Sequence, residues 1–323
     1  MMLTSHFFVQ RGLTRSSKAL SLRSSCKSVV PLNGTIRGSF PARQKESDVE
    51  LNGFSNPLSP SGTASLVEPP PHHIGADAIR VVFRAGRDLA RRYLPEPLEP
   101  VEDGLGFAYV ADMVKVSADE PDQAFLSPRR TQYGEGIVGF YCRLGERAGR
   151  FSTFIWVTQD WSMGFGSIMG WGKKIGEVWR THLNPYNPAM GEVGPGARLA
   201  GEVTRLGRPV LRVGIEIERA ITPAEMPGYG DRGYLLRHQP SPGPEIPAAT
   251  QLLELQLRGV RTGDVFTGRP HLEIHDAENE DLAPLRDCEP IAAYAYKQGW
   301  TTDTDARLVH DYSAADHSAG GPA

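Results

Sequence analysis

Two adjacent lysines, Lys173 and Lys174, are the residues of this sequence best suited to do chemistry. They follow twelve consecutive residues without charge, residues 161–172, which read WSMGFGSIMGWG. Apolar surroundings favour the neutral form of an amine, and a second ammonium beside it acts in the same direction. A neutral lysine amine can attack a ketone and form a Schiff base. The pattern predicts a Schiff-base lysine, although most lysine pairs are simply solvated at the surface.

Two further charged residues accompany strand-like segments. Glu135 closes the short sequence Tyr133-Gly-Glu135 and precedes an apolar run. A carboxylate that enters a β core needs a partner or a function, so Glu135 is a candidate site residue; a turn glutamate at a strand start is the alternative. Arg80 is the second candidate site residue, because the planar fork of donors on its guanidinium suits a carboxylate. A surface or ion-paired arginine is the common alternative there.

Motifs for other chemistries are weak or missing. His271, Glu273 and His275 alternate along a strand-like segment and would share one face. That spacing could ligate a metal, but a solvated strand face is the favoured interpretation, and we predict no metal. The sequence holds no G-x-G-x-x-G before a helix, no phosphate-binding loop and no G-x-S-x-G. Nucleotide-binding and α/β-hydrolase functions therefore have no support.

The elements that must hold these groups are mostly strands. Residues 87–93 have helical spacing and stop before Pro95. Residues 151–157 (FSTFIWV) are rich in aromatic and β-branched residues, which predicts a strand. Residues 198–206 and 210–219 read as a hairpin, with alternate residues 211–217 on one face. Further strands are expected at 79–83, 107–116, 137–142, 252–260, 265–268 and 272–274. This order predicts a mainly β (α+β) fold, antiparallel, with a few peripheral helices.

Composition narrows the class of protein. The chain has 323 residues, 40% of them hydrophobic, and a formal net charge of -3. This balance gives no general attraction to nucleic acid or membranes, and no run of about 18 apolar residues suggests a membrane span. The three cysteines are far apart, which argues against disulfides and zinc and favours a reducing, cytoplasmic location.

The first 72 residues differ from the rest. Eight basic residues precede the first acidic one, Glu46. An Arg-rich, Ser-rich and acid-poor segment is typical of an organellar presequence, here residues 1–45; a disordered extension is the alternative. We expect residues 1–72 to be a disordered or presequence-like extension, residues 73–312 to form the folded domain, and residues 313–323 to be a flexible tail.

Motifs spread along residues 80–312 resemble those of the acetoacetate decarboxylase family. Gly172-Lys-Lys-Ile-Gly176 resembles the family's P-K-K-L-G signature, and Tyr133-Gly-Glu135 resembles its glutamate-bearing site strand. Three other regions match in family order: Tyr93–Leu98 (YLPEPL), Gly233–Leu236 (GYLL), and Thr267–Leu272 (TGRPHL) with Asp281–Pro284 (DLAP). One such motif is weak, but several in the right order identify the chain as a member.

The resemblance implies a cone-shaped, largely antiparallel β barrel, commonly in a homo-oligomer, with the lysine pair inside. It implies that Lys173 is the nucleophile, that Lys174 favours the neutral amine by its charge, and that Glu135 is an active-site residue. Acetoacetate decarboxylase is itself a standard example of this activation. Arg80 would replace the family arginine at the substrate. An apolar pocket is expected from Trp156, Phe165, Met169 and Trp171.

The function this implies is a cofactor-independent lyase acting on a small keto acid. Decarboxylation of acetoacetate or a related β-keto acid through an iminium on Lys173 is the preferred reaction. The chain also departs from the family: Gly172 replaces the proline before the lysines, and Ser167-Ile168 replaces an acidic segment. These changes keep two alternatives open. One is a pyruvate or 2-keto acid aldolase-dehydratase that uses the same lysine, and the other is a barrel that binds a small ligand without catalysis.

Overall fold

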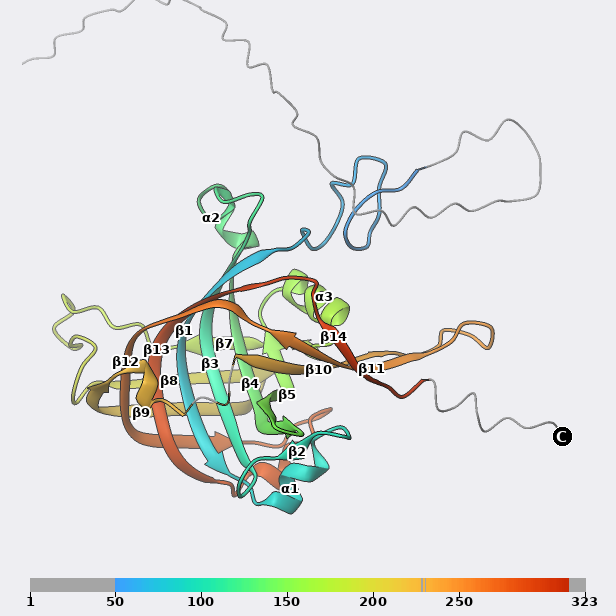
Figure 1. The fold of residues 1–323 in the computed structure, drawn as a ribbon. Coiled ribbons are helices and arrows are strands. Elements are labelled where there is room, and N and C mark those ends of the chain that lie inside the picture. The colour runs from blue at the N-terminus through green and yellow to red at the C-terminus, as the bar shows by residue number, and fades with distance from the viewer. Residues whose placement is uncertain (1–49, 228, 230, 314–323) are drawn as a thin grey trace, which may run out of the picture.

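The computed structural model describes residues 50–227, 229 and 231–313, and it arranges most of them in one large sheet (Figure 1). The strands are β1 (His72–Arg84), β2 (Glu99–Pro100), β3 (Leu105–Ser117), β4 (Gln132–Leu144), β5 (Arg147–Val157), β6 (Lys173–Ile175), β7 (Glu177–Arg180), β8 (Arg198–Arg205), β9 (Arg208–Ile221), β10 (Arg232–Gln239), β11 (Ala249–Gln256), β12 (Arg258–Ile274), β13 (Glu289–Thr302) and β14 (Arg307–Asp311). The α-helices are α1 (Arg87–Arg92), α2 (Gln123–Leu126) and α3 (Asp160–Met169), and short 3₁₀ turns occupy Pro128–Arg130, Pro223–Glu225 and Ala283–Leu285.

The sheet is largely antiparallel, as the sequence predicts. Its strand order is β14-β11-β10-β5-β4-β3-β1-β13-β12-β9-β8-β7, with β2 beside β4 and β6 beside β5. Only the β5–β10 and β5–β6 pairs are parallel among the described strands. The two edge strands β14 and β7 do not pair with each other. The described sheet is therefore mixed and not closed, and with its few helices it confirms the predicted mainly β, largely antiparallel fold class.

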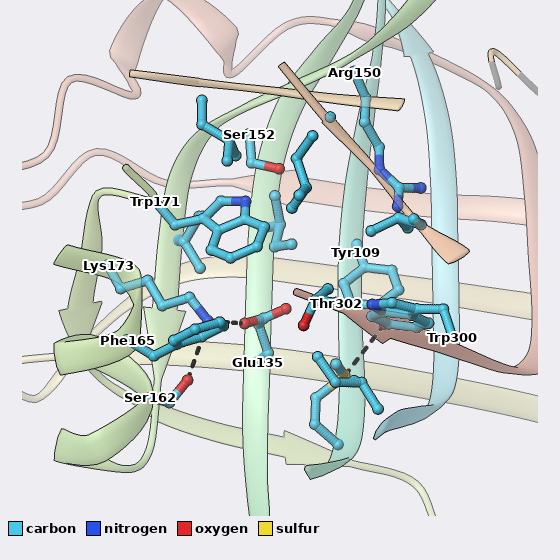
Figure 2. Close-up of a pocket in the computed structure, with 18 of the residues that line it drawn as sticks. Tyr109, Glu135, Arg150, Ser152, Ser162, Phe165, Trp171, Lys173, Trp300 and Thr302 are labelled. Atoms are coloured by element: carbon cyan, nitrogen blue, oxygen red, sulfur yellow. Dashed lines mark hydrogen bonds and ion pairs between the residues drawn. The ribbon is translucent and has the colours of Figure 1, made fainter. Parts of the chain in front are cut away.

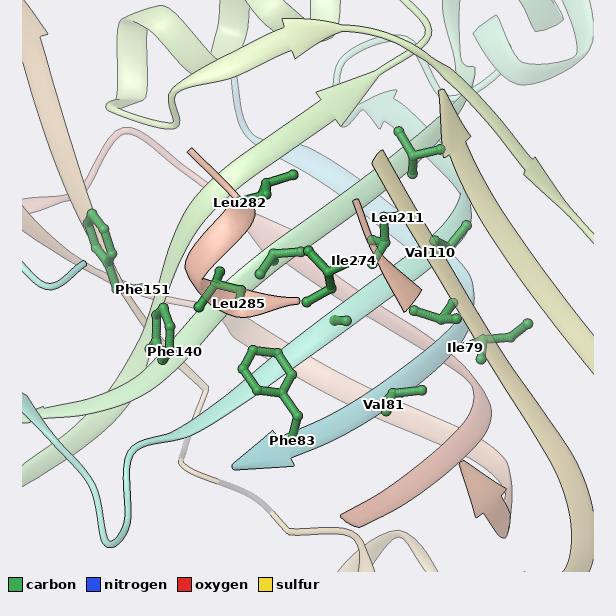
Figure 3. Packing of buried hydrophobic residues seen from close by; sticks show 14 of the residues in the cluster. Ile79, Val81, Phe83, Val110, Phe140, Phe151, Leu211, Ile274, Leu282 and Leu285 are labelled. Atoms are coloured by element: carbon green, nitrogen blue, oxygen red, sulfur yellow. The ribbon is translucent and has the colours of Figure 1, made fainter. Parts of the chain in front are cut away.

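The central strands are buried on both faces, which explains their nearly continuous apolar sequences. In β1, Ile79, Val81 and Phe83 belong to one buried cluster (Figure 3), whereas the alternate residues Ala78 and Val82 belong to a second cluster on the other face. The hairpin predicted at residues 198–219 forms as β8 and β9, with residues 211, 213, 215 and 217 buried as expected. Arg80 alternates onto the second face of β1, where the candidate site lies.

The folded region begins earlier than the predicted boundary at residue 73. Val67 is fully buried, and Phe54 and Leu66 pack beside it against Phe165 and Met169 of α3. Residues 50–71 thus contribute to the domain, and the expectation of a disordered segment is wrong for them. Residues 1–49 and 314–323 lie outside the described residues, so the predicted presequence and most of the predicted tail remain predictions. No helix within the described ranges has the length and apolar character needed to cross a membrane.

Candidate active site

Lys173 lies in a pocket bounded by β1, β3, β4, β5 and β10 together with α3 (Figure 2). Its strand β6 runs parallel to β5, with Lys173 opposite Ile155. The Lys173 side chain is only 6% exposed, and its Nζ donates to Glu135 Oε2 at 2.8 Å and to Ser162 Oγ at 3.1 Å. The structure therefore brings the predicted nucleophile and the predicted carboxylate together, with a hydroxyl that sequence reasoning did not single out.

A tight turn after α3 aims Lys173 into this pocket. Gly170 ends the helix in the left-handed conformation, at φ 99°, which glycine adopts without steric cost. The Trp171 N–H then donates to the Gly166 carbonyl, and the Lys173 N–H donates to the Trp171 carbonyl, each at 2.8 Å. A Cβ on Gly166 would lie 2.8 Å from Lys173 Cγ and 2.7 Å from the Trp171 oxygen. The helix can lie against the lysine only because this residue is glycine.

Aromatic rings surround the amine. Lys173 Nζ lies 5.5 Å from the centroid of the Tyr133 ring and 5.7 Å from that of the Trp171 ring. Phe165 packs against Trp171, with their centroids 5.8 Å apart. Burial and the charge of Glu135 raise the pKa of Tyr133 well above its usual value, so its hydroxyl stays protonated at neutral pH. Two of the four residues predicted to form an apolar wall, Phe165 and Trp171, line the pocket.

Lys174 points to the opposite face of β6. Its Nζ donates to Glu280 Oε2 at 2.9 Å and to the Asn279 carbonyl at 2.5 Å, and its side chain is 34% exposed. Trp156 also turns to this side, where its Nε1 donates to Glu280 Oε1 at 3.1 Å. Trp156, Met169 and Lys174 are therefore outside the pocket lining, in contrast to the expectation for each. The charge of Lys174 is balanced by Glu280 instead of facing the Lys173 amine.

A different lysine shares the pocket with Lys173. Lys115 is 2% exposed, and its Nζ lies 3.2 Å from Glu68 Oε2 and 4.9 Å from the centroid of the Trp161 ring. Burial lowers the pKa of Lys115, and the charge of Lys173 acts in the same direction, while Glu68 opposes both. Sequence reasoning missed this residue. The available signal was a charged residue within the apolar strand 107–116, on the same alternating face as Met113.

Two arginines complete the lining. Arg80 is 9% exposed, and its guanidinium carbon lies 5.0 Å from the centroid of the Tyr296 ring and 6.0 Å from that of Tyr109. Arg150, on β5, was not predicted, although it stands directly before the strand-like run that begins at Phe151. Burial lowers the pKa of Arg150, and so does the charge of Arg80. Both guanidiniums still carry charge at neutral pH, because arginine does not lose its proton in proteins.

The histidine-rich segment of β12 lies away from this pocket. His271 Nε2 lies 2.7 Å from Glu273 Oε1, and His275 Nε2 lies 3.3 Å from Glu273 Oε2. All three side chains are more than 40% exposed. Within the described residues, no three His, Cys, Asp or Glu side chains gather in a way that could hold a metal ion.

The chain belongs to the acetoacetate decarboxylase family, whose model matches residues 55–313. Among solved structures, it is similar to an acetoacetate decarboxylase-like enzyme from Sphingomonas wittichii RW1, with 30% identity, a TM-score of 0.76, and coverage of 80% of this chain and 99% of that one. The enduracididine biosynthesis enzyme MppR, complexed with the condensation product of pyruvate and imidazole 4-carboxaldehyde, is 26% identical, with a TM-score of 0.74 and coverage of 83% and 100%.

A structure described as acetoacetate decarboxylase is 15% identical, with a TM-score of 0.64 and coverage of 80% of this chain and 96% of that one. At that identity the likeness shows the fold alone. No match is found among curated proteins. Family membership and the enzymes among these neighbours support an enzyme, and the family resemblance is thereby confirmed.

Proposed function

We propose that this protein is a cofactor-independent Schiff-base lyase in which Lys173 forms an iminium with a small keto acid. The observation that supports this most is the placement of Lys173 Nζ, buried in a pocket and within 2.8 Å of a carboxylate and 3.1 Å of a hydroxyl. Lys174 is paired with a carboxylate in the same way, but it does not line the cavity with its aromatic walls and two arginines.

The neighbours of the amine supply the proton transfers that iminium formation needs. Glu135 accepts a proton from the Lys173 ammonium, and the neutral amine adds to the keto carbon. In the adduct a proton moves from the nitrogen to the oxygen, and the resulting hydroxyl takes a second proton from Glu135 and leaves as water, which yields the iminium. Ser162 holds the amine in line during both steps through its 3.1 Å contact. Glu135 thus acts first as a base at the Lys173 nitrogen and then as an acid at the carbinolamine oxygen.

The iminium has two possible fates, and we favour condensation. Removal of a proton from the carbon beside the iminium gives an enamine, which attacks an aldehyde; loss of water follows. Glu135 is close enough to the amine to serve as the base for that proton. The MppR structure, 26% identical over 83% of this chain, holds the condensation product of pyruvate and an aldehyde. The chain is more similar to that enzyme than to the solved decarboxylase, at 15% identity.

Decarboxylation is the second candidate, and the aromatic wall favours it. Phe165 and Trp171 give the pocket an apolar side near Lys173. A carboxylate held there loses hydration, and this favours its departure as neutral carbon dioxide. In this reaction the iminium accepts the electron pair of the broken carbon-carbon bond, and the resulting enamine is protonated and hydrolysed. The substrate would be acetoacetate or a related β-keto acid.

Borohydride trapping tests the shared step. The protein is treated with borohydride and either pyruvate or acetoacetate, and the modified peptide is located by mass spectrometry. We expect a reduced adduct on Lys173 and not on Lys174. Failure to trap an adduct on Lys173 from folded protein with either acid would overturn the proposal and favour a binding protein without catalysis.

The two reactions are then separated by their products. Pyruvate with imidazole 4-carboxaldehyde should give a conjugated product that absorbs in the near ultraviolet, whereas acetoacetate should give little enzymatic carbon dioxide. The opposite pattern would make the protein a decarboxylase.

We also propose that the protein forms a homo-oligomer and lies in the cytoplasm. Light scattering would test the first proposal, and localisation of the native protein would test the second.

A further inference from the structure

Two of the four basic side chains in the pocket have no anionic partner. Lys173 is paired with Glu135, and Lys115 is paired with Glu68. Neither Arg80 nor Arg150 forms an ion pair with any described residue, and Nε of Arg80 is buried without a hydrogen-bond partner. Two cation–carboxylate pairs cancel, so the pocket retains two positive charges.

Unpaired buried cations are costly, because the protein replaces the water that hydrated them. Within the described residues, no carboxylate pairs with Arg80 to offset this cost. The nearest groups are tyrosines, and the hydroxyls of Tyr141 and Tyr296 are themselves buried without hydrogen-bond partners. Burial raises the pKa of Tyr296, so its hydroxyl is a proton donor at neutral pH. Unpaired donors and two guanidiniums together form a site that an anion would complete.

Arg150 lies away from the reacting amine. Along β5, Arg150 is five residues before Ile155, which pairs with Lys173. At about 3.3 Å per residue, the two backbone positions are roughly 16 Å apart along the strand. Figure 2 shows Arg150 at the upper right and Lys173 at the left of the pocket. Both long side chains reach into the cavity, so an anion on Arg150 would be separated from a keto carbon on Lys173 by several bonds.

We infer that Arg80 and Arg150 bind a distal carboxylate, and that the substrate class is therefore a keto diacid whose second carboxylate lies several carbons from the keto group. This inference rests on the proposed function, since it assumes that the keto group reacts at Lys173. The guanidinium forks match a carboxylate in shape as well as charge. A keto diacid brings a carboxylate to these arginines, whereas a short monoanion such as pyruvate, held at Lys173, does not.

The test compares keto acids that differ only at the far end. 2-Oxoadipate and 2-oxohexanoate have the same number of carbons, but only the first carries a distal carboxylate. The quantity measured is the concentration that gives half-maximal borohydride adduct on Lys173. We expect 2-oxoadipate to reach this point at a concentration at least about 10-fold lower, the range of one charge-assisted hydrogen-bonded contact. Equal concentrations for the two acids would overturn the inference.

Variants connect the preference to the arginines. Arg150→Gln should reduce the advantage of 2-oxoadipate over 2-oxohexanoate about 10-fold. Arg150→Lys keeps the charge but loses the planar fork, and should retain part of the advantage. Arg80→Gln should behave like Arg150→Gln. An advantage that survives in both Gln variants, each checked for folding by circular dichroism, would place the distal carboxylate elsewhere and contradict the inference.

A binding experiment separates this inference from the proposed function. Adipate and hexanoate contain no keto group and need no chemistry at Lys173. In the Lys173→Ala variant, adipate should raise the melting temperature more than hexanoate at equal concentration, because a ligand of the native state stabilises it. Loss of the adduct with all keto acids would overturn the proposed function, whereas equal effects of adipate and hexanoate would overturn the inference alone.

Discussion

The two faces of β6 put the same residue type to different uses. On the pocket face, Lys173 is 6% exposed and contacts Glu135, whose side chain is 10% exposed. On the other face, Lys174 is 34% exposed and contacts Glu280, whose side chain is fully buried. Each lysine has a carboxylate within 2.9 Å. An ion pair alone therefore does not distinguish a reactive lysine from a structural one; the cavity around it does.

The difference follows from strand geometry. Successive residues of a strand point to opposite sides, so neighbours in sequence are separated by the backbone when they lie in β6. The like charge expected from Lys174 is balanced at Glu280, which also contacts Arg205 Nε at 3.1 Å. Lys115 is instead the second lysine on the pocket side, and its own pKa is lowered in part by Lys173. The second lysine near Lys173 therefore comes from β3, which is separated from β6 by β5 and β4, and not from the adjacent residue.

The strongest test of this comparison is to remove each lysine in turn. Lys173→Ala should lower kcat/KM by more than about 10⁴-fold, because loss of a nucleophile removes the covalent route. Lys174→Ala should remain within about 10-fold of the parent and should still form the borohydride adduct. Steady-state assays with the preferred keto acid would measure both. Equal losses in the two variants, with both proteins folded, would contradict the separation of the two faces.

Glu135 and Glu280, the carboxylates that pair with the two lysines, should also differ in their effect on activity. Glu135→Gln preserves the shape of the side chain but removes the proton acceptor, and a fall in kcat of about 10²- to 10⁴-fold is expected. Glu280→Gln is the matched control on the other face and should leave kcat nearly unchanged. Rapid-quench trapping would also show whether adduct formation itself slows in Glu135→Gln. Adduct formation at the parental rate in Glu135→Gln would show that Glu135 takes no part in iminium formation on Lys173.

A glycine substitution tests how finely Lys173 is positioned. In Gly166→Ala the new Cβ would meet Lys173 Cγ at 2.8 Å, so the lysine must shift. Displacement of a reacting group by about 1 Å can cost about 10²-fold in rate, and we expect a loss of that size in kcat. Gly172→Ala is the control, since nothing lies within 4 Å of its Cβ. Similar activities in the two variants would show that the turn tolerates movement of the lysine.

Substitutions on the face of β6 opposite the pocket should have the largest effect on the free energy of unfolding. Glu280 accepts hydrogen bonds from Lys174 and Trp156 and lies beside Arg205. Its removal leaves these groups without their shared partner, so Glu280→Ala should lower the free energy of unfolding by about 3 kcal/mol. Urea denaturation would measure this, with Glu278→Ala as a nearby control. A change below about 1 kcal/mol would show that Glu280 is not a structural centre.

Much of the fold follows from the sequence, because the strands alternate or are continuously apolar. Helix α1 and the hairpin β8–β9 were both predicted from periodicity and turn residues, and the structure confirms them. Helix α3 was not predicted. It contains Gly164 and Gly166, which are poor helix formers, and each sits where a Cβ would collide with Leu66 or Lys173. Tertiary packing selected glycine there, and that hides the helix from propensity arguments.

The site was less predictable than the fold. Lys173 and Glu135 stand out in the sequence, and the structure places them in contact. Lys115 and Arg150 do not stand out, because their roles depend on strand pairing across the sheet. Glu68 lies in the segment that composition assigned to a disordered extension, yet it is the partner of Lys115. Long-range pairing decides these contacts, and no local pattern encodes it.

The smallest expected effect is a pH dependence of the free energy of unfolding that comes from His72. His72 is fully buried, its Nε2 lies 3.0 Å from the Glu68 carbonyl, and its Nδ1 has no hydrogen-bond partner. Burial, assisted by the charge of Lys115, lowers the pKa of His72 from 6.5 to about 4. Between these values the unfolded chain binds a proton that the folded chain does not, so stability falls as pH falls through this window.

The loss of folding stability caused by His72 should amount to about 2 kcal/mol between pH 7 and pH 5. His72→Gln removes the titrating ring while keeping a donor for the Glu68 carbonyl, so its free energy of unfolding should fall by about 2 kcal/mol less than that of the parent over the same range. Urea titrations at both pH values would measure the difference, and the exposed neighbour His73→Gln should retain the parental slope. Identical slopes in the parent and His72→Gln would mean that His72 titrates normally.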